Sequence, residues 1–223
     1  MVTLVFAKLP EPGRVMTRLC PPLTPAQAAD VQRLCLRRVW RMAGNHGDRC
    51  ILVASPDTAS EAFAHLLGDD IVVWPQGGGD LGARLTRATR RAFEEEAGGV
   101  TLLGADSPTL PWVVLDTLGN LLDDDDVVLG PSADGGYYLL AMRAYQPVLF
   151  ERIDWSTDRV ARQTRERAGG VGLSIRELPT GYDIDSIGDL RRAIRDLARD
   201  GEAELAATLG EIVRAGGDRP VTG

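Results

Sequence analysis

The stretch Val100-Thr-Leu-Leu-Gly-Ala-Asp-Ser-Pro-Thr-Leu-Pro111 decides the fold, because a short apolar run in it stops abruptly at one carboxylate, Asp106. Residues 100–103 predict a buried strand of a parallel sheet, and Pro111 suits the first turn of a following helix. In open α/β sheets, ligands bind outside the carboxyl ends of the strands. Asp106 is therefore a candidate ligand for a metal ion that carries phosphates, and a capping role in the following turn is an equal alternative.

Strand patterns alternate with helix patterns on both sides of this stretch. Further strands are expected at residues 3–7, 49–54, 70–74, 127–129, 137–142 and 171–178. Helices are expected after Pro111 and at residues 25–44, 58–67, 81–97, 158–168, 189–199 and 202–215. This alternation predicts an α/β protein with three layers, α/β/α, and a mostly parallel sheet. We expect one domain at residues 1–216 and a flexible tail at 217–223.

The composition narrows the class of protein. Hydrophobic residues make up 44% of the 223 residues, and no apolar run approaches the roughly 18 residues that would cross a bilayer. The first ten residues lack the pattern of a secretion signal. Cys20, Cys35 and Cys50 are widely spaced, which argues against both disulfides and a zinc site. Because the net charge is −7, nucleic acid is disfavoured as a partner, and a cytoplasmic protein without a membrane partner is expected.

A basic loop, Lys8-Leu-Pro-Glu-Pro-Gly-Arg-Val-Met-Thr-Arg-Leu19, follows the first expected strand. Lys8, Arg14 and Arg18 bring three cations close together in an otherwise acidic protein. Gly13 allows the backbone to approach a ligand closely. At the carboxyl end of a strand this composition suits a phosphate cradle, and a solvated loop with scattered arginines is the alternative.

A glycine-rich turn, Gln76-Gly-Gly-Gly-Asp-Leu-Gly82, leads into the helix expected at residues 81–97. Three consecutive glycines permit a flat ligand, such as a base or a ribose, to lie against the backbone. Gln76 could read a base edge, because its amide offers both a donor and an acceptor. From composition alone, a plain flexible turn is the favoured interpretation.

The segment Asp134-Gly-Gly136 would make either an acidic loop that receives a polar acceptor or a hairpin turn. Trp155 precedes an expected helix that Ser156 or Thr157 would cap. A tryptophan is unusual at that position unless it packs or stacks on another group.

A second acidic segment lies near the end of the chain, where Asp183 and Asp185 stand two residues apart in an extended stretch. Their side chains are expected to point to the same side, and Ser186 is the expected cap of the next helix. Asp106 would need such a second carboxylate to share a divalent ion.

Seven motifs stand in order along the chain: FAKLPEPGRVMTRL, LTPAQAA, QGGGDLGARL, GADSPTLP, GPSADGGYYLL, IDWSTDRV and YDIDSIGDL. This set closely resembles a bacterial family of predicted glycosyltransferases with the Rossmann-like nucleotide-diphospho-sugar transferase (GT-A) fold. The match extends from about residue 3 to residue 195. The pattern is similar, more remotely, to 2-phospholactate guanylyltransferase and to the molybdenum cofactor guanylyltransferases.

The resemblance implies a role for each motif. The nucleotide would be bound by Lys8, Gly13, Arg14, Arg18, Gln76, Gly79 and Asp80. Asp106 would hold Mg²⁺ or Mn²⁺ together with Asp185 or, as the weaker candidate, Asp183, and the catalytic pair would be Asp106 and Arg18. The acceptor side would be lined by Asp134, Gly135, Gly136, Tyr137, Trp155, Ser156 and Thr157. The expected partners are a nucleotide or nucleotide-sugar and a small acceptor, and a homodimer is left open.

One position departs from the family pattern, which has Lys where this chain has Met16. Three hypotheses remain. The first is metal-dependent transfer of a sugar from a nucleotide-diphospho-sugar, which the loss of a phosphate-binding cation at Met16 favours slightly. The second is nucleotidyl transfer, which joins an NTP to a small phosphorylated acid or sugar. The third is a non-catalytic nucleotide-binding protein.

Overall fold

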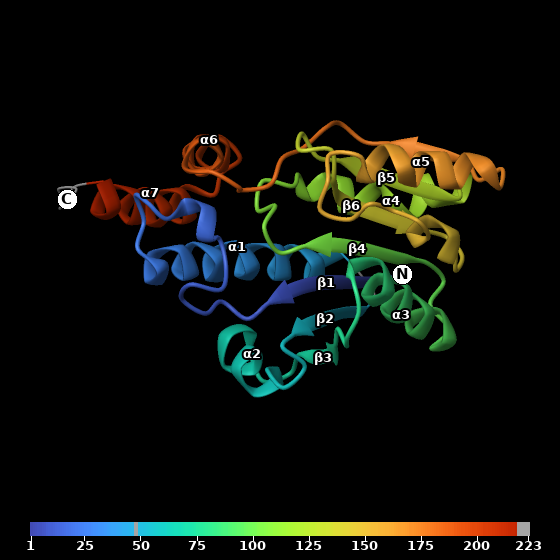
Figure 1. Ribbon diagram of the computed structural model, residues 1–223, viewed down its shortest axis with the longest axis horizontal. Coiled ribbons are helices and arrows are strands. Elements are labelled where there is room, and N and C mark those ends of the chain that lie inside the picture. Colours follow the sequence, from blue (N-terminus) through green and yellow to red (C-terminus); the bar gives the residue numbers. More distant parts are fainter. Residues whose placement is uncertain (47–48, 218–223) are drawn as a thin grey trace.

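The computed structural model describes residues 1–46 and 49–217, in which a seven-stranded sheet lies between layers of helices (Figure 1). The strands are β1 (Val2–Lys8), β2 (Arg49–Ser55), β3 (Val72–Pro75), β4 (Val100–Gly104), β5 (Val127–Pro131), β6 (Tyr137–Met142) and β7 (Ile175–Glu177). The α-helices are α1 (Pro25–His46), α2 (Ser60–Leu67), α3 (Leu81–Glu94), α4 (Trp112–Asp124), α5 (Val160–Gly170), α6 (Ile187–Arg199) and α7 (Ala203–Gly217). Two short 3-10 helices are η1 (Thr17–Leu19) and η2 (Pro147–Phe150). No helix in the described ranges is long and apolar enough to cross a membrane.

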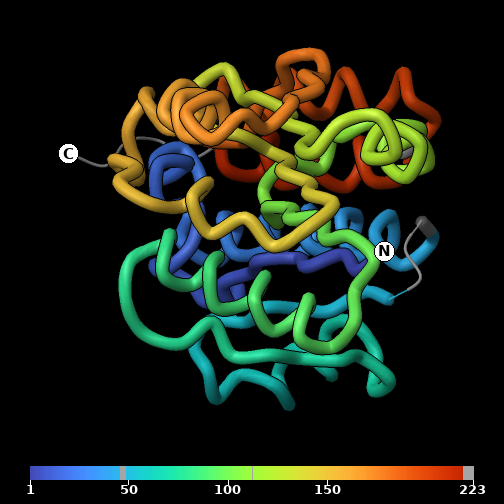
Figure 2. The backbone as a smooth tube through the Cα atoms, turned by 90° about the vertical axis from the view of Figure 1, so that its right-hand side faces the viewer, coloured from blue at the N-terminus to red at the C-terminus, as the bar shows by residue number. Residues whose placement is uncertain are grey.

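The sheet has the strand order β3-β2-β1-β4-β6-β5-β7 and is parallel except for β6, which runs antiparallel to both of its neighbours. Figures 1 and 2 both place β3 and α2 at one end of the molecule and β5 with α5 at the other, in agreement with this order. Because β1, β2 and β4 are parallel neighbours, their carboxyl ends at Lys8, Ser55 and Gly104 meet at one edge of the sheet. The predicted α/β class and mostly parallel sheet are confirmed.

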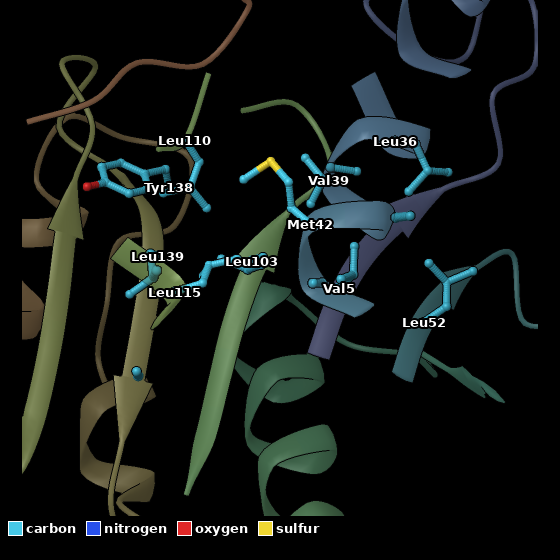
Figure 3. Packing of buried hydrophobic residues seen from close by; sticks show 14 of the residues in the cluster. Val5, Leu36, Val39, Met42, Leu52, Leu103, Leu110, Leu115, Tyr138 and Leu139 are labelled. Carbon is cyan, nitrogen blue, oxygen red and sulfur yellow. The ribbon is translucent and has the colours of Figure 1, made fainter. Parts of the chain in front are cut away.

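Each face of the sheet buries its own apolar cluster. On one face, side chains of the strands meet the apolar sides of α1, α2 and α4. Figure 3 shows part of this cluster, including Val5, Leu36, Val39, Met42, Leu52, Leu103, Leu115 and Leu139. On the other face, the strands meet α3, η2 and α5. The alternation of side chains along each strand produces these two clusters, and the three-layer prediction is confirmed.

A third apolar cluster lies beyond the sheet, where α6 and α7 pack beside the first half of α1 (Figure 1). Leu19 and Leu23, which follow the basic loop, are buried in this cluster. Ile184, which separates the two aspartates of the late acidic segment, is buried in it as well. The cluster therefore fixes both the basic loop and that acidic segment at the same edge of the sheet.

Most differences from the sequence predictions concern where elements begin and end. The helix predicted from residue 158 begins at Val160, and the structure shows no side-chain cap at its start, so the expected caps Ser156 and Thr157 are wrong. Thr157 Oγ1 accepts a hydrogen bond from Arg159 N at 3.3 Å, within the preceding loop. Ser186 caps α6 as predicted. Of the predicted tail, Gly217 belongs to α7 and the rest lies outside the described residues.

Candidate active site

Two adjoining cavities open at the carboxyl edge of the sheet. The first cavity, of about 430 Å³, is lined on one side by the basic loop, including Lys8, Arg14 and Met16. The second cavity, of about 470 Å³, is lined by the turn between β5 and β6 and by residues 155–158. Side chains that line both cavities are Leu81, Asp106, Tyr137, Asp183 and Asp185. The three shared carboxylates therefore lie where the two cavities meet.

Asp106 follows the end of β4 by two residues, at the position that the sequence predicts. A Cβ atom on Gly104 would lie 2.7 Å from Asp106 Oδ1, so the glycine leaves the space that this carboxylate uses. The side chain is open to the cleft, yet the surrounding protein limits its hydration. This limited hydration, and then the charge of Asp183, raise the pKa of Asp106 to about 7, and Asp185 and Asp134 act in the same direction.

Asp183 is held on both of its carboxylate oxygens by hydroxyl groups. Ser107 Oγ donates a hydrogen bond to Asp183 Oδ1, and Ser132 Oγ donates one to Oδ2 at 3.2 Å. Both serines are buried. The backbone of Ile184 donates to the carbonyl oxygen of Asp106 at 3.2 Å, which joins the two acidic segments directly. The pKa of Asp183 is raised above its ordinary value, chiefly by partial burial, although the two hydroxyl groups act in the opposite direction.

Asp185 makes a different contact. Arg18 Nη1 lies 2.8 Å from Asp185 Oδ2, and both side chains are exposed. Arg18 lines the second cavity, whereas Lys8 and Arg14 line the first. The basic loop therefore divides its cations between the two cavities. Gly13 has a φ of +77° in this loop and lies outside the walls of both cavities.

Met16 occupies the position where the family pattern has Lys, and it lines the first cavity. Its backbone is left-handed, with φ 45° and ψ 37°, which costs a non-glycine residue about 1 kcal/mol. Its side chain also packs against the third apolar cluster. The first cavity therefore has a thioether at the place where the pattern would supply an ammonium group.

The glycine-rich turn is more ordered than its composition predicts. Gln76 is buried, and its amide donates to the carbonyl oxygens of Val53 at 3.0 Å and Ala7 at 3.3 Å. Its Oε1 accepts from Arg84 at 3.2 Å. The Gln76 amide is thus used within the fold, and recognition of a base edge by Gln76 stays a prediction.

The other predicted residues of this turn also have structural contacts. Asp80 caps α3 by accepting from Ala83 N at 2.8 Å, and Gly79 has a φ of +96°. The carbonyl oxygens of Gly78 and Gly79 accept from arginines of α3. From this region of the described chain, Leu81 lines both cavities.

The predicted acceptor residues converge on the second cavity. Those that line it are Asp134, Gly136, Tyr137, Trp155, Ser156 and Thr157. The turn containing Asp134 is also the hairpin that the sequence left open, because β5 and β6 pair antiparallel on either side of it. Gly135 has a φ of +89°, and a Cβ atom there would collide with the backbone carbonyl of Asp158. Gly135 therefore contributes by letting the turn pack against residues 158–161.

Trp155 packs as its unusual position suggests. Its ring lies edge-on to that of Tyr137, with a centroid distance of 6.5 Å. A Cβ atom on Gly82 would lie 2.5 Å from Trp155 Nε1, so the first turn of α3 leaves room for the indole. The two aromatic rings form one wall of the second cavity.

The sequence did not indicate several residues of the site, among them four with polar side chains. Ser107 and Ser132 hold Asp183, while Asp158 lines the second cavity and the buried Gln32 lines the first. Ser107, Ser132 and Asp158 lie within three of the seven family motifs, GADSPTLP, GPSADGGYYLL and IDWSTDRV. Their place in these motifs is the sequence feature that could have indicated them. Their contacts could not be predicted because the partners are distant in sequence.

The carboxylates between the two cavities are candidate ligands of a divalent metal ion. Within residues 1–46 and 49–217, no three acidic, His or Cys side chains are grouped so that they alone could hold a metal ion. Mg²⁺, however, is usually bound by one or two carboxylates together with water and substrate phosphates. Asp106 and its acidic neighbours supply such oxygen donors beside a cavity that carries cations. The donor set therefore fits an ion that arrives with a phosphorylated ligand.

Known structures share this architecture. A crystal structure of a protein assigned as a nucleotide-diphospho-sugar transferase, from Desulfovibrio desulfuricans G20, matches with a TM-score of 0.87 and 30% identity over 96% of each chain. The manganese complex of Rv0371C from Mycobacterium tuberculosis H37Rv shares the fold, with a TM-score of 0.51 and 20% identity over 86% of this chain and 96% of that one. Fold and relatives together define the class, which is that of transferases that use a nucleotide substrate.

Residues 38–157 match the family described as "Uncharacterized protein conserved in bacteria (DUF2064)", and the chain belongs to this family. It is also 32% identical to a phosphoenolpyruvate guanylyltransferase from Rubrobacter xylanophilus over 199 residues, which cover 84% of this chain and 92% of that protein.

Proposed function

We propose that this protein transfers a sugar from a nucleotide-diphospho-sugar to a small acceptor, with the help of a divalent metal ion. The observation that carries the proposal is the division of the cleft. Lys8 and Arg14 line only the first cavity, and Asp134, Asp158 and Trp155 line only the second, while Asp106, Asp183 and Asp185 lie between the two.

The first cavity would hold the donor. Lys8 and Arg14 would face its diphosphate, where their positive charges offset the phosphate charges. The apolar side chains of Phe6, Val15 and Leu81 would pack against its nucleoside. Two cations suit a diphosphate better than a triphosphate, and Met16 adds no further charge.

Asp106, together with Asp185 or Asp183, would hold Mg²⁺ or Mn²⁺ between the two cavities. When bound, such an ion would neutralise the charge that develops on the departing nucleoside diphosphate. Asp183 is oriented by its two serines, and Asp185 is oriented by Arg18. Asp134, Tyr137 and Trp155 would line the place of the acceptor on the other side of these carboxylates.

Guanylyl transfer is the second candidate, because the relative from Rubrobacter xylanophilus carries that name. This reaction would place a nucleoside triphosphate in the first cavity and release pyrophosphate. The cations available there, and Met16 in particular, make it the weaker candidate.

The leaving product distinguishes the two reactions. The protein would be incubated with Mn²⁺, a pool of small acceptors and, in separate reactions, GDP-sugars, UDP-sugars, GTP and UTP. We expect a nucleoside diphosphate to be released from a sugar donor only when acceptors are present. Acceptor-dependent release of pyrophosphate from GTP or UTP would contradict the proposal and support guanylyl transfer or a related nucleotidyl transfer.

A further inference from the structure

The second cavity has an unusual charge for a site that meets a nucleotide. The carboxylates that line it are those of Asp106, Asp134, Asp158, Asp183 and Asp185. Among the described residues of its wall, the only basic side chain is Arg18, and its guanidinium is paired with Asp185 at 2.8 Å. A divalent ion on Asp106 would leave the wall with a negative net charge. An anionic acceptor would therefore enter against repulsion from the wall.

The wall also contains groups that suit a hydroxylated compound. Tyr137 and Trp155 contribute aromatic surface, and Ser156 contributes a hydroxyl group. The Thr157 hydroxyl is used within its loop, where it donates to Asp154 O at 2.7 Å and accepts from Arg159 N at 3.3 Å. Carboxylates accept hydrogen bonds from hydroxyl or ammonium groups, and hydroxyl side chains both donate and accept. Aromatic surfaces cover the apolar faces of a ring and also attract cations.

The shape of this wall depends on contacts that are built into the fold. Asp134 Oδ1 accepts from the backbone of Gly136 at 2.9 Å, so its carboxylate is fixed at the tip of the hairpin. The absence of a side chain at Gly82 leaves the space for the indole of Trp155. The aromatic and acidic parts of the wall are thus held in place before any ligand enters.

We propose that the acceptor is a polyhydroxylated compound without negative charge, such as a neutral sugar, a polyol or an amino sugar. This inference rests on the proposed function, because it assigns the second cavity to the acceptor. An acceptor hydroxyl oxygen would form a bond to the anomeric carbon of the donor as the bond from that carbon to the diphosphate oxygen breaks. The nucleoside diphosphate would leave with the electron pair, and the hydroxyl proton would pass to a carboxylate of the second cavity and on to solvent.

Four related compounds test the inference: glucose, glucosamine, glucose 6-phosphate and glucuronate. Their binding to the full chain, loaded with Mn²⁺ and a nucleoside diphosphate, would be followed by tryptophan fluorescence, with Trp155→Phe as the reference that removes the local signal. We expect glucose and glucosamine to bind at least about tenfold more tightly than the two anions. Equal or tighter binding of the anions would overturn the inference, and so would the absence of a response to all four compounds.

A charge variant provides a second measurement. In the double variant Asp134→Asn, Asp158→Asn, each amide keeps the size of the side chain and removes one negative charge. We expect the ratio of the affinity for glucose 6-phosphate to the affinity for glucose to rise about tenfold. The control is Asp123→Asn, an exposed carboxylate on α4, which should change neither affinity. An unchanged preference in the double variant would overturn the inference.

Failure of the inference and failure of the proposed function give different results. Release of pyrophosphate, combined with a preference for uncharged compounds, would contradict sugar transfer and leave the charge class of the acceptor standing. Release of a nucleoside diphosphate, combined with a preference for anions, would support sugar transfer and contradict the inference that the acceptor is uncharged.

Discussion

Asp183, at the junction of the two cavities, is oriented by hydrogen bonds to both of its carboxylate oxygens. Asp183 accepts hydrogen bonds from Ser107 and Ser132, which are both buried. Residues that orient metal-binding carboxylates commonly affect metal affinity almost as much as the ligands themselves. The two serines are therefore expected to matter for metal binding through their hydrogen bonds to Asp183.

Replacement of Ser107 tests this expectation. Ser107→Ala removes one of the two hydroxyl groups on Asp183, so we expect the affinity for Mn²⁺ in the presence of a nucleoside diphosphate to fall about tenfold. Calorimetric titration with Mn²⁺ would measure the change. The control is Thr117→Ala, which removes a hydroxyl that donates to Val114 O within α4. Equal affinities in Ser107→Ala and wild type would refute a positioning role.

Asp106 should make the stability of the protein depend on pH. Its pKa in the folded state is raised to about 7, from an ordinary value of 3.8, chiefly by limited hydration and by Asp183. A raised pKa stabilises the protein at pH values below the unfolded pKa, and this contribution is lost as the pH rises through 7. The folded protein without metal should therefore lose stability between pH 5 and pH 8.

The variant Asp106→Asn isolates this effect, because an amide does not titrate. Without metal, we expect the variant to gain about 1 kcal/mol relative to wild type between pH 5 and pH 8, less than the full shift because cleft water screens the charge. Urea unfolding at both pH values would measure the difference. A difference that is the same at pH 5 and at pH 8 would show that Asp106 does not titrate in this range.

At the scale of elements, the basic loop decides what the first cavity can bind. It leaves β1 at Lys8, passes through the left-handed residue Met16 and is anchored by Leu19 in the third apolar cluster. The loop therefore presents position 16 to the cavity from a fixed backbone. A side chain at this position can change the charge of the cavity without any change of fold.

Met16→Lys should consequently alter nucleotide selection. An added ammonium in the first cavity is expected to tighten binding of nucleoside triphosphates about tenfold, and binding of nucleoside diphosphates by a smaller factor. Competitive binding of UTP against UDP, and of GTP against GDP, would measure the ratio. Met16→Gln, which has similar length and no charge, is the matched control and should leave the ratio unchanged. If both variants behave alike, charge at position 16 does not govern selection.

The sequence predicted elements more accurately than contacts. The strand around residues 100–103 and the position of Asp106 follow from a local pattern, and so does the cap at Ser186. The Gln76 amide, by contrast, donates to the carbonyl oxygens of Val53 and Ala7, and Ser107 donates to Asp183. These partners lie far away along the chain, so no local pattern predicts them. Local patterns set the position of a side chain at the sheet edge, whereas its hydrogen-bond partners depend on how distant segments pack.

At the scale of the whole molecule, one helix joins two of the three apolar clusters. The second half of α1, with Leu36 and Val39, lies in the cluster on one face of the sheet, while Val31 and Cys35 lie in the cluster with α6 and α7. Because α1 is continuous from Pro25 to His46, neither cluster can open without disturbing the other.

We therefore propose that residues 1–216 form one domain and predict a single cooperative unfolding transition. Urea unfolding followed by tryptophan fluorescence and by far-ultraviolet circular dichroism should give coincident curves. Two separated transitions, with α6 and α7 lost before the sheet, would contradict the single domain.

The central claim is that the carboxylates between the two cavities hold a metal ion together with a nucleotide. Calorimetric titration of GDP, UDP and their sugar conjugates, with and without Mn²⁺, tests it most directly in wild type, Asp106→Ala and the exposed control Asp123→Ala. We predict binding of at least one nucleotide that requires Mn²⁺ and is lost in Asp106→Ala but kept in the control. Binding that is the same with and without Mn²⁺, or that survives in Asp106→Ala, would contradict the claim.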